Sequence, residues 1–188
     1  MESNGQNTAL KLYWDIIIRW GLIAALASVV LFLVITMSGM KTVGTGGIIQ
    51  FVLGVALTLY ILFMAFKMIR DERQGGYLNL GQAVVNGTLI AVLSSLVMFV
   101  FMQIYMNYID PGYMESIQRE SMEFMTKIAG ENEEAMEKME EEMAKQKDKM
   151  GFSVMNIAGN LLSSGIFGAI MSLIMGAVMR KDPNQNIA

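Results

Sequence analysis

The sequence predicts an all-α integral membrane protein, built as a bundle of four membrane-spanning helices. An extramembrane amphipathic helix or helical hairpin is expected between the third and fourth spans. Hydrophobic residues make up 54% of the 188 residues and charged residues only 16%, whereas about 25% of a typical soluble domain is charged. The apolar residues also gather in four runs of roughly 20 residues, the length that a helix needs to cross a bilayer. The whole chain, 1–188, is therefore expected to form a single membrane domain.

The expected spans cover residues 16–38, 47–66, 83–106 and 154–179. None of them contains a proline or has a charged residue in its middle, and Arg19 lies near the start of the first. A long helix of a soluble protein usually keeps a polar face. Four helices without one would leave a soluble chain of this length almost no polar surface, so the lipid bilayer is the expected surrounding of these helices.

The positions of Lys and Arg predict the orientation of the spans, because cytoplasmic loops carry an excess of these residues close to the membrane. One side of the predicted bundle collects Lys11, Arg19, Lys67, Arg70, Arg73, Arg180 and Lys181. The other side has Lys41 and the basic residues of a long segment in which Glu predominates. Both termini are therefore expected in the cytoplasm of a bacterial cell, with residues 107–153 outside the inner membrane, in the periplasm.

The segment 111–150 is rich in Met and Glu and has the periodicity of an amphipathic helix. Met114, Ile117, Met125 and Ile128 fall near one face of its first part, and Gly130 predicts a kink or a break. After Gly130 the same spacing continues, through the candidate partner-helix residues Met136, Met139 and Met143. This stripe could be covered by a helical hairpin, by lipid or by a second copy of the chain. An acidic helix suits an anionic lipid surface poorly, which favours a hairpin or a protein partner bound through residues 113–150.

The composition disfavours most enzymatic chemistry. The chain has neither His nor Cys, which removes the commonest general base, the thiolate nucleophile and the usual zinc ligands. Thioethers can hold copper(I), but helix periodicity alone explains the spacing of the Met stripe. The net charge of −3 argues against nucleic-acid binding. The sequence thus predicts no catalytic, cofactor-binding or metal-binding residue, no cofactor and no nucleic-acid partner, and we expect that the protein is not an enzyme.

Two sets of residues inside the spans are candidates for a structural or functional role. A row of small residues on the fourth span permits close approach of another helix, from this chain or a second copy; the row is Gly165, Gly168, Ser172 and Gly176. Polar side chains on the third and fourth spans, Asn86, Asn156 and Asn160, indicate helix contacts or a polar path for a substrate. No charged residue lies deep in a span, which argues against a conventional ion-coupled transporter.

Two short motifs resemble a known family. Residues 75–83 read GGYLNLGQA before the third span, and residues 105–111 read YMNYIDP after it. With the four-span layout, these motifs resemble the DUF4199 family of small membrane proteins from Bacteroidetes. The resemblance implies an inner-membrane location and transfers no catalytic residue. In the first motif, Gln82 is expected to cap the third helix or to contact the second.

Two functional hypotheses remain. The first is a non-enzymatic structural, assembly or accessory subunit that acts through its outward acidic helix. The alternative is a small transporter or channel-like protein that uses the polar residues of the third and fourth spans. A cavity lined by all three of Asn86, Asn156 and Asn160 would favour the alternative.

Overall fold

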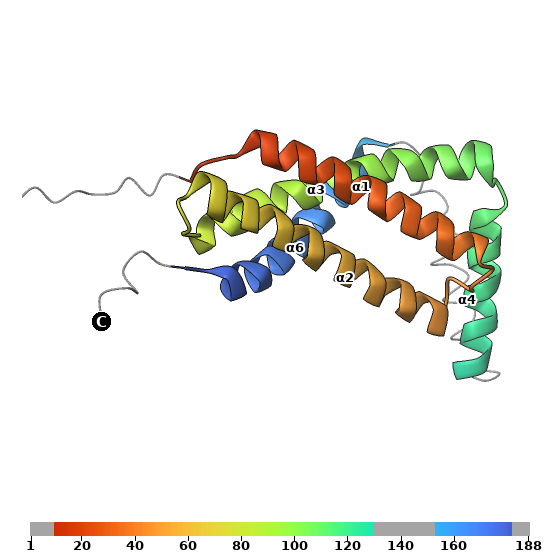
Figure 1. Cartoon of the computed structure of the whole chain (residues 1–188). Helices are drawn as coiled ribbons and strands as arrows, with labels where there is room; N and C mark the ends of the chain where they lie inside the picture. The colour runs from red at the N-terminus through yellow and green to blue at the C-terminus, as the bar shows by residue number, and fades with distance from the viewer. Residues whose placement is uncertain (1–9, 130–152, 182–188) are drawn as a thin grey trace, which may run out of the picture.

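The computed structural model describes residues 10–129 and 153–181, and these residues are almost entirely helical (Figure 1). Two π-helical turns, η1 (Ile69–Arg73) and η2 (Tyr105–Ile109), extend the second and third long helices. The helices are α1 (Trp14–Met37), α2 (Thr45–Met68), α3 (Leu80–Ile104), α4 (Tyr113–Ala129) and α6 (Val154–Met179).

The predicted fold class is confirmed. Within residues 10–129 and 153–181, four helices are long and apolar enough to cross a membrane: α1, α2 with η1, α3 with η2, and α6. Their outward surfaces carry large exposed apolar side chains, such as Leu26 on α1 and Phe51 on α2. These surfaces suit contact with lipid chains, because hydrocarbon cannot satisfy polar groups. The protein is therefore a helical membrane protein, with α4 outside the four spans.

The third span, α3, is the centre of the bundle. It packs along α6 on one side and along α1 on the other, whereas α2 contacts mainly α1 and α6. A buried apolar cluster joins the helices at one end and includes Ile16, Phe66 and Leu78. A second, aromatic cluster lies at the other end, where α4 begins.

Close packing of small residues joins α3 to α6. The pairs that meet are Ala83 with Gly176, Gly87 with Ser172 and Ala91 with Gly168. A Cβ atom on Gly168 would lie only 2.5 Å from the Ala91 Cβ. The partner of the small-residue row on α6 is thus a similar row on α3 of the same chain, with residues four apart on both helices. Gly165 takes no part in this tight contact, because a Cβ there would lie 3.9 Å from the nearest atom, on Val92.

The segment that follows α6 is fixed to the turn before α3. The backbone of Leu78, in the turn before α3, exchanges two hydrogen bonds with Lys181, at 3.2 and 3.4 Å. The turn contains Gly75 and Gly76 with φ of +60° and +91°, values that favour glycine. Asn79, rather than Gln82, caps α3 through its side chain, which accepts from the Gly81 amide. Figure 1 shows this end of the bundle opposite the end where α4 lies.

Candidate functional site

The helix α4 lies across one end of the bundle (Figure 1). Its first residue, Tyr113, is buried against Phe32 of α1 and Tyr105 of η2. The ring centroids lie 5.6 Å apart for Phe32–Tyr113 and 5.4 Å apart for Tyr105–Tyr113, both edge to face. Aromatic pairs prefer this arrangement, so the cluster fixes the start of α4 on the bundle.

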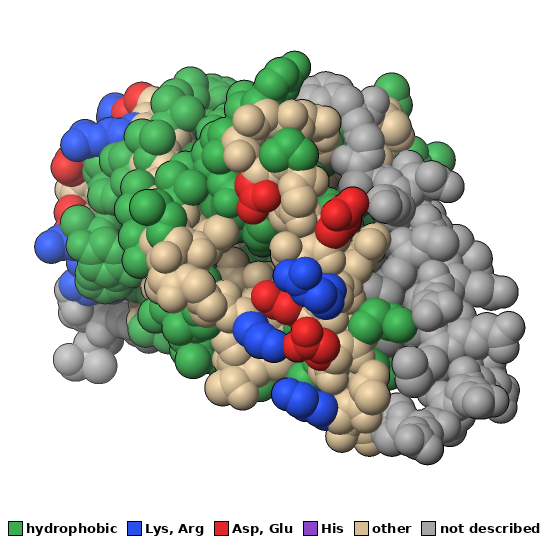
Figure 2. Space-filling view, turned by 90° about the vertical axis from the view of Figure 1, so that its right-hand side faces the viewer, with side chains coloured by type: hydrophobic (Ala, Val, Ile, Leu, Met, Phe, Trp, Pro, Cys, Tyr) green, Lys and Arg blue, Asp and Glu red, His purple; other side chains and the backbone are tan. Residues whose placement is uncertain are grey.

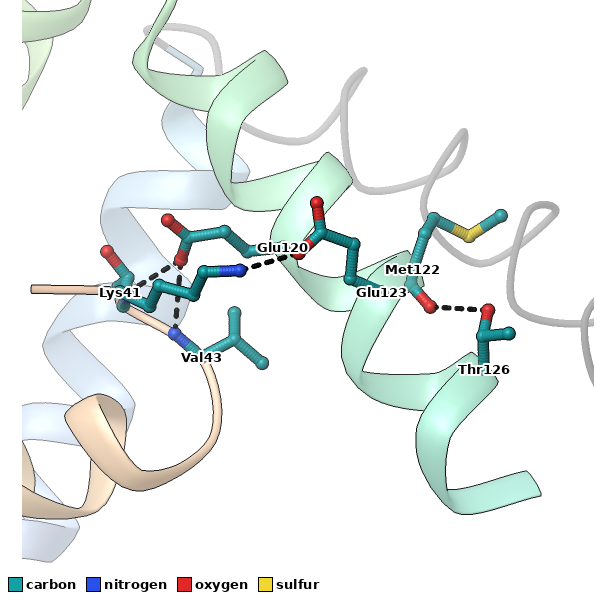
Figure 3. Close-up of polar contacts among 7 residues, drawn as sticks. Lys41, Val43, Glu120, Met122, Glu123 and Thr126 are labelled. Carbon is teal, nitrogen blue, oxygen red and sulfur yellow. Dashed lines mark hydrogen bonds and ion pairs between the residues drawn. The ribbon is translucent and has the colours of Figure 1, made fainter. Parts of the chain in front are cut away.

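Polar contacts fix the middle of α4 to the loop between α1 and α2 (Figure 3). One carboxylate oxygen of Glu120 accepts from the backbone amides of Thr42, at 2.7 Å, and Val43, at 3.3 Å. One turn further on, Glu123 forms an ion pair with Lys41, 2.6 Å from Oε2 to Nζ. These contacts satisfy backbone donors of the loop that leads into α2, and a carboxylate is a strong acceptor for such donors.

A close apolar contact completes the attachment of α4. Gly44, just before α2, has φ of +76°, and a Cβ there would lie 3.0 Å from the Phe124 ring. Glycine meets both requirements, the positive φ and the space for the ring. Figure 2 shows acidic and basic side chains interleaved on this end of the molecule. Around the loop contact, the charged residues that line one shallow pocket are Lys41, Glu120, Glu123 and Lys127.

A groove of about 720 Å³ opens between α3, α4 and α6. Five methionines line it, together with Phe99, Ile117 and several polar side chains; they are Met98, Met102, Met106, Met114 and Met155. The groove exists because α3 and α6 separate toward the α4 end. Among the described residues, a Cβ on Gly159 of α6 would meet no atom within 4 Å, whereas one on Gly168 would clash with α3.

A smaller cavity of about 210 Å³ lies deeper, among α1, α2, α3 and α6. Hydroxyl groups from all four helices line it: Ser28, Thr58, Ser94, Ser95 and Ser164. Three of them, Thr58, Ser95 and Ser164, donate to a backbone carbonyl three or four residues earlier, at 2.9, 2.9 and 3.2 Å. The lone pairs of these oxygens remain available to a guest. Ser95 and Met98 line both the cavity and the groove, so the two are adjacent.

The family of this chain follows from its sequence match. The family described as "Protein of unknown function (DUF4199)" matches residues 19–181. The chain belongs to this family. The resemblance seen in the two motifs is thereby confirmed over most of the chain, including α4 and all but the first turns of α1. Comparisons with curated proteins and with solved structures gave no match.

In this DUF4199 protein, Asn86 serves the attachment of the N-terminal segment. Its side chain is fully buried, and Oδ1 accepts from the Tyr13 amide at 2.9 Å. Its Nδ2 donates to the backbone oxygens of Lys11, at 3.0 Å, and Gln82, at 2.9 Å. Gln82 Oε1 is a further acceptor at 3.3 Å. The amide thus holds the extended residues before α1 against α3.

The structure places the other polar candidates far from Asn86. Asn156 and Asn160 lie on the first turns of α6 and line the groove at the α4 end, whereas Asn86 lies near the start of α3 at the opposite end. The three asparagines therefore share no cavity among the described residues. Met136, Met139, Met143 and the predicted kink or break at Gly130 lie outside the described residues, which end at Ala129 before resuming at residue 153.

Sequence reasoning missed Glu120, Lys41 and the small residues of α3. The row Ala83, Gly87 and Ala91 has the same spacing of four as the row on α6, so its spacing was a usable signal. Glu120 carries no such signal, because it is one of many Glu residues on the segment and only the fold brings it to the loop.

Replacing Glu120 by alanine should release the loop before α2. The Thr42 and Val43 amides would lose a charged acceptor, and this loss should raise the equilibrium constant for local opening of the loop about tenfold or more. Hydrogen exchange at these two amides measures the effect. Glu115→Ala, at an exposed position of α4, is the matched control and should leave both amides protected. Equal exchange in the two variants would show that Glu120 does not hold the loop.

The ion pair between Lys41 and Glu123 should make α4 docking sensitive to pH. The hydrogen bond that Glu123 accepts from Lys41 lowers the pKa of Glu123 below the ordinary 4.5, and the positive charge of Lys41 lowers it further. The stabilisation that ionised Glu123 contributes to α4 docking is therefore fully present above pH 4.5, and it is lost as pH falls through the lowered pKa of the folded state. In turn, Glu123 raises the pKa of Lys41 above 10.5. The stabilisation that charged Lys41 contributes is therefore lost only as pH rises through that higher value.

A carboxyl titration followed by nuclear magnetic resonance tests this pair. In Lys41→Met, the pKa of Glu123 should rise toward 4.5, because the largest cause of its shift is removed. In the control Lys127→Met it should rise much less, because Lys127 contributes only a lesser charge interaction. A larger change in the control would contradict the assignment.

Proposed function

We propose that this DUF4199 protein is a non-enzymatic accessory or assembly subunit of a bacterial inner membrane. It acts through its outward end, where α4 presents a surface to another protein. The observation that carries the proposal is the attachment of α4 to the α1–α2 loop by Glu120 and Glu123. A helix fixed in this way is a preformed surface, and little conformational entropy is lost when it binds.

Apolar side chains on α4 that stay exposed among the described residues support the proposal of a protein partner. Ile128 is 66% exposed and Phe124 39% exposed, one helical turn apart on the same helix. Apolar side chains gathered on an exposed helix mark interaction sites more often than single ones do. The carboxylates of Glu120 and Glu123 bind the α1–α2 loop, so their role is structural. This use of the two carboxylates supports a non-enzymatic function.

Site-specific photo-cross-linking in native membranes tests the proposal. A photoreactive residue at Ile128 should give one discrete adduct with another polypeptide, and the adduct should be weaker when Glu120→Ala loosens the contact between α4 and the α1–α2 loop. The same probe at Val30, a 59% exposed position on α1, is the control and should not give that adduct. An absence of adducts at position 128, or the same adduct from both positions, would contradict a partner surface on α4.

Basic residues support an orientation with α4 outside. Lys11, Lys67, Arg70 and Lys181 belong to the end of the bundle opposite α4, and such residues gather on the cytoplasmic side. Because the chain has no Cys, single cysteines report accessibility directly. We expect a membrane-impermeant maleimide to label Lys127→Cys in cells with a permeable outer membrane. Lys181→Cys should react only after lysis, and the reverse pattern would invert the assignment.

A second candidate function, a passage for a small neutral solute, is favoured by one observation. The hydroxyl-lined cavity adjoins the groove at Ser95 and Met98. Liposome swelling with glycerol as the probe tests it. A passage requires that the purified protein speeds swelling and that Ser95→Phe, at the junction, slows it, with Ser163→Phe on the exposed side of α6 as control. Swelling equal to that of empty liposomes would remove this candidate.

A further inference from the structure

The groove beneath α4 has the shape of a ligand site. Its volume of about 720 Å³ lies in the range of roughly 300–1,000 Å³ that is usual for small-molecule sites. Its walls are the diverging ends of α3 and α6, and its cover includes Tyr113, Met114 and Ile117 of α4. The small-residue contact from Gly168 onward holds the two walls together at their base.

Apolar and polar side chains both line the groove, with Ser95 at its deep end and Met106 and Met155 toward its mouth. Because α3 runs toward α4, Met98 and Met102 lie deeper than Gln103 and Met106. Because α6 runs away from α4, Asn156 lies at the mouth and Asn160 one turn below it. Methionine side chains are flexible and adapt to irregular apolar guests. A guest that fits has an apolar chain for the methionines and a polar group for the few polar side chains.

Two features define the polar end of the guest. Asn160 lines the groove, and within the described part of the chain its buried Oδ1 meets no hydrogen-bond donor. A buried amide oxygen without a donor is costly, so a donor on the guest would satisfy it. Among the described lining residues none is charged. A phosphate would need Lys or Arg there, so the polar end of the guest is neutral, as a hydroxyl group is.

We propose that this groove binds one uncharged lipid with a hydroxyl headgroup, of the acylglycerol class, from the leaflet on the α4 side. Its hydrocarbon chain lies between α3 and α6 against Met98 and Met102. Its hydroxyl group donates to Asn160 Oδ1. This binding goes beyond the accessory function and does not depend on it.

Photolabelling of the full chain tests the proposal. The probe is a monoacylglycerol with a diazirine in its acyl chain, in phosphatidylcholine nanodiscs that contain the protein. The same labelled chain on phosphatidylglycerol is the comparison for the headgroup. The monoacylglycerol should label residues 98–106 and 154–160, excess unlabelled monoacylglycerol should displace it, and phosphatidylglycerol should label these residues far less.

Two variants and one matched control separate the site from ordinary lipid contact. Gly159→Leu fills the groove and should abolish the label, because a Cβ there meets no atom of the described chain within 4 Å. Asn160→Ala should lower it about fivefold, the loss expected for one hydrogen bond. Gly54→Leu is the control: a Cβ on Gly54 of α2 also meets open space, but Gly54 does not line the groove, and labelling should be unchanged. Both leucines favour helix over the glycines that they replace, so folding is retained.

Three outcomes would overturn the proposal. Equal labelling by the two headgroups would show ordinary boundary lipid. Labelling that survives Gly159→Leu would place the lipid outside the groove. A photoreactive residue at position 159 that captures another polypeptide in native membranes would show that a helix, rather than a lipid, occupies the groove.

Discussion

Replacing Gly87 by valine is expected to lower the free energy of unfolding by about 3 kcal/mol, the upper part of the usual range for overpacking. A Cβ atom at this position would lie 2.1 Å from Ser172 Oγ and 2.9 Å from Ser172 Cβ. The hydroxyl could rotate, but the Cβ moves only with the backbone of α6. The two helices must therefore separate along the whole small-residue contact.

Reversible unfolding in mixed detergent micelles, followed by circular dichroism, measures this loss. Gly54→Val is the control, because a Cβ on Gly54 meets no atom within 4 Å in the part of the chain that the structure describes, and it should unfold like the parent protein. The second substitution Ser172→Gly, added to Gly87→Val, should restore part of the stability, since it removes both conflicting atoms of Ser172. The Phe66 ring, 2.8 Å from the added Cβ, prevents full recovery. If Gly87→Val unfolded like Gly54→Val, α3 and α6 would not be in the contact described.

Replacing Asn86 by leucine is expected to cost a comparable amount, about 3 kcal/mol, because it leaves buried polar groups without partners. The Tyr13 amide would lose its acceptor, and the carbonyl of Lys11 would lose its donor. Leucine is similar in volume, so the loss reflects hydrogen bonding more than packing. The residues before α1 should then leave the surface of α3.

Hydrogen exchange at the Tyr13 amide, together with the free energy of unfolding, measures both parts of this effect. Asn107→Leu is the matched control, since Asn107 is exposed and donates only to Gln103 of its own helix among the described contacts. It should change the stability by less than about 0.5 kcal/mol, as surface substitutions usually do. Unchanged protection of the Tyr13 amide in Asn86→Leu would contradict a role in holding the N-terminal segment.

The spans were predictable because a single physical requirement, a continuous apolar length, determines them. The fourth predicted span and α6 have the same bounds, Val154–Met179. The second and third spans run further than the apolar pattern alone suggested, because η1 and η2 continue them as π-helical turns. Nothing in the residues Ile69–Arg73 distinguishes a wider helical turn from the end of a helix.

The site was less predictable, because its residues meet through long-range packing. Asn86 was recognisable as a polar residue in a span, but its partners Lys11 and Tyr13 lie more than 70 positions away. The groove had a weak signal in the sequence. At intervals of four along α6, the row of small residues runs from Gly176 back to Ser164, and Asn160 and Asn156 continue it. The change to asparagine marks where close contact with α3 ends.

The central position of α3 has a consequence for biosynthesis. The helices α1 and α2 leave the ribosome before α3, yet α1 finds most of its packing surface on α3. Until residues 80–104 are inserted, the first hairpin lacks its main contact, and the Tyr13 amide lacks the Asn86 side chain. We therefore expect the early hairpin to be the stage at which an insertase or a membrane chaperone shields the nascent chain. Arrival of the third helix, rather than the last, should release it.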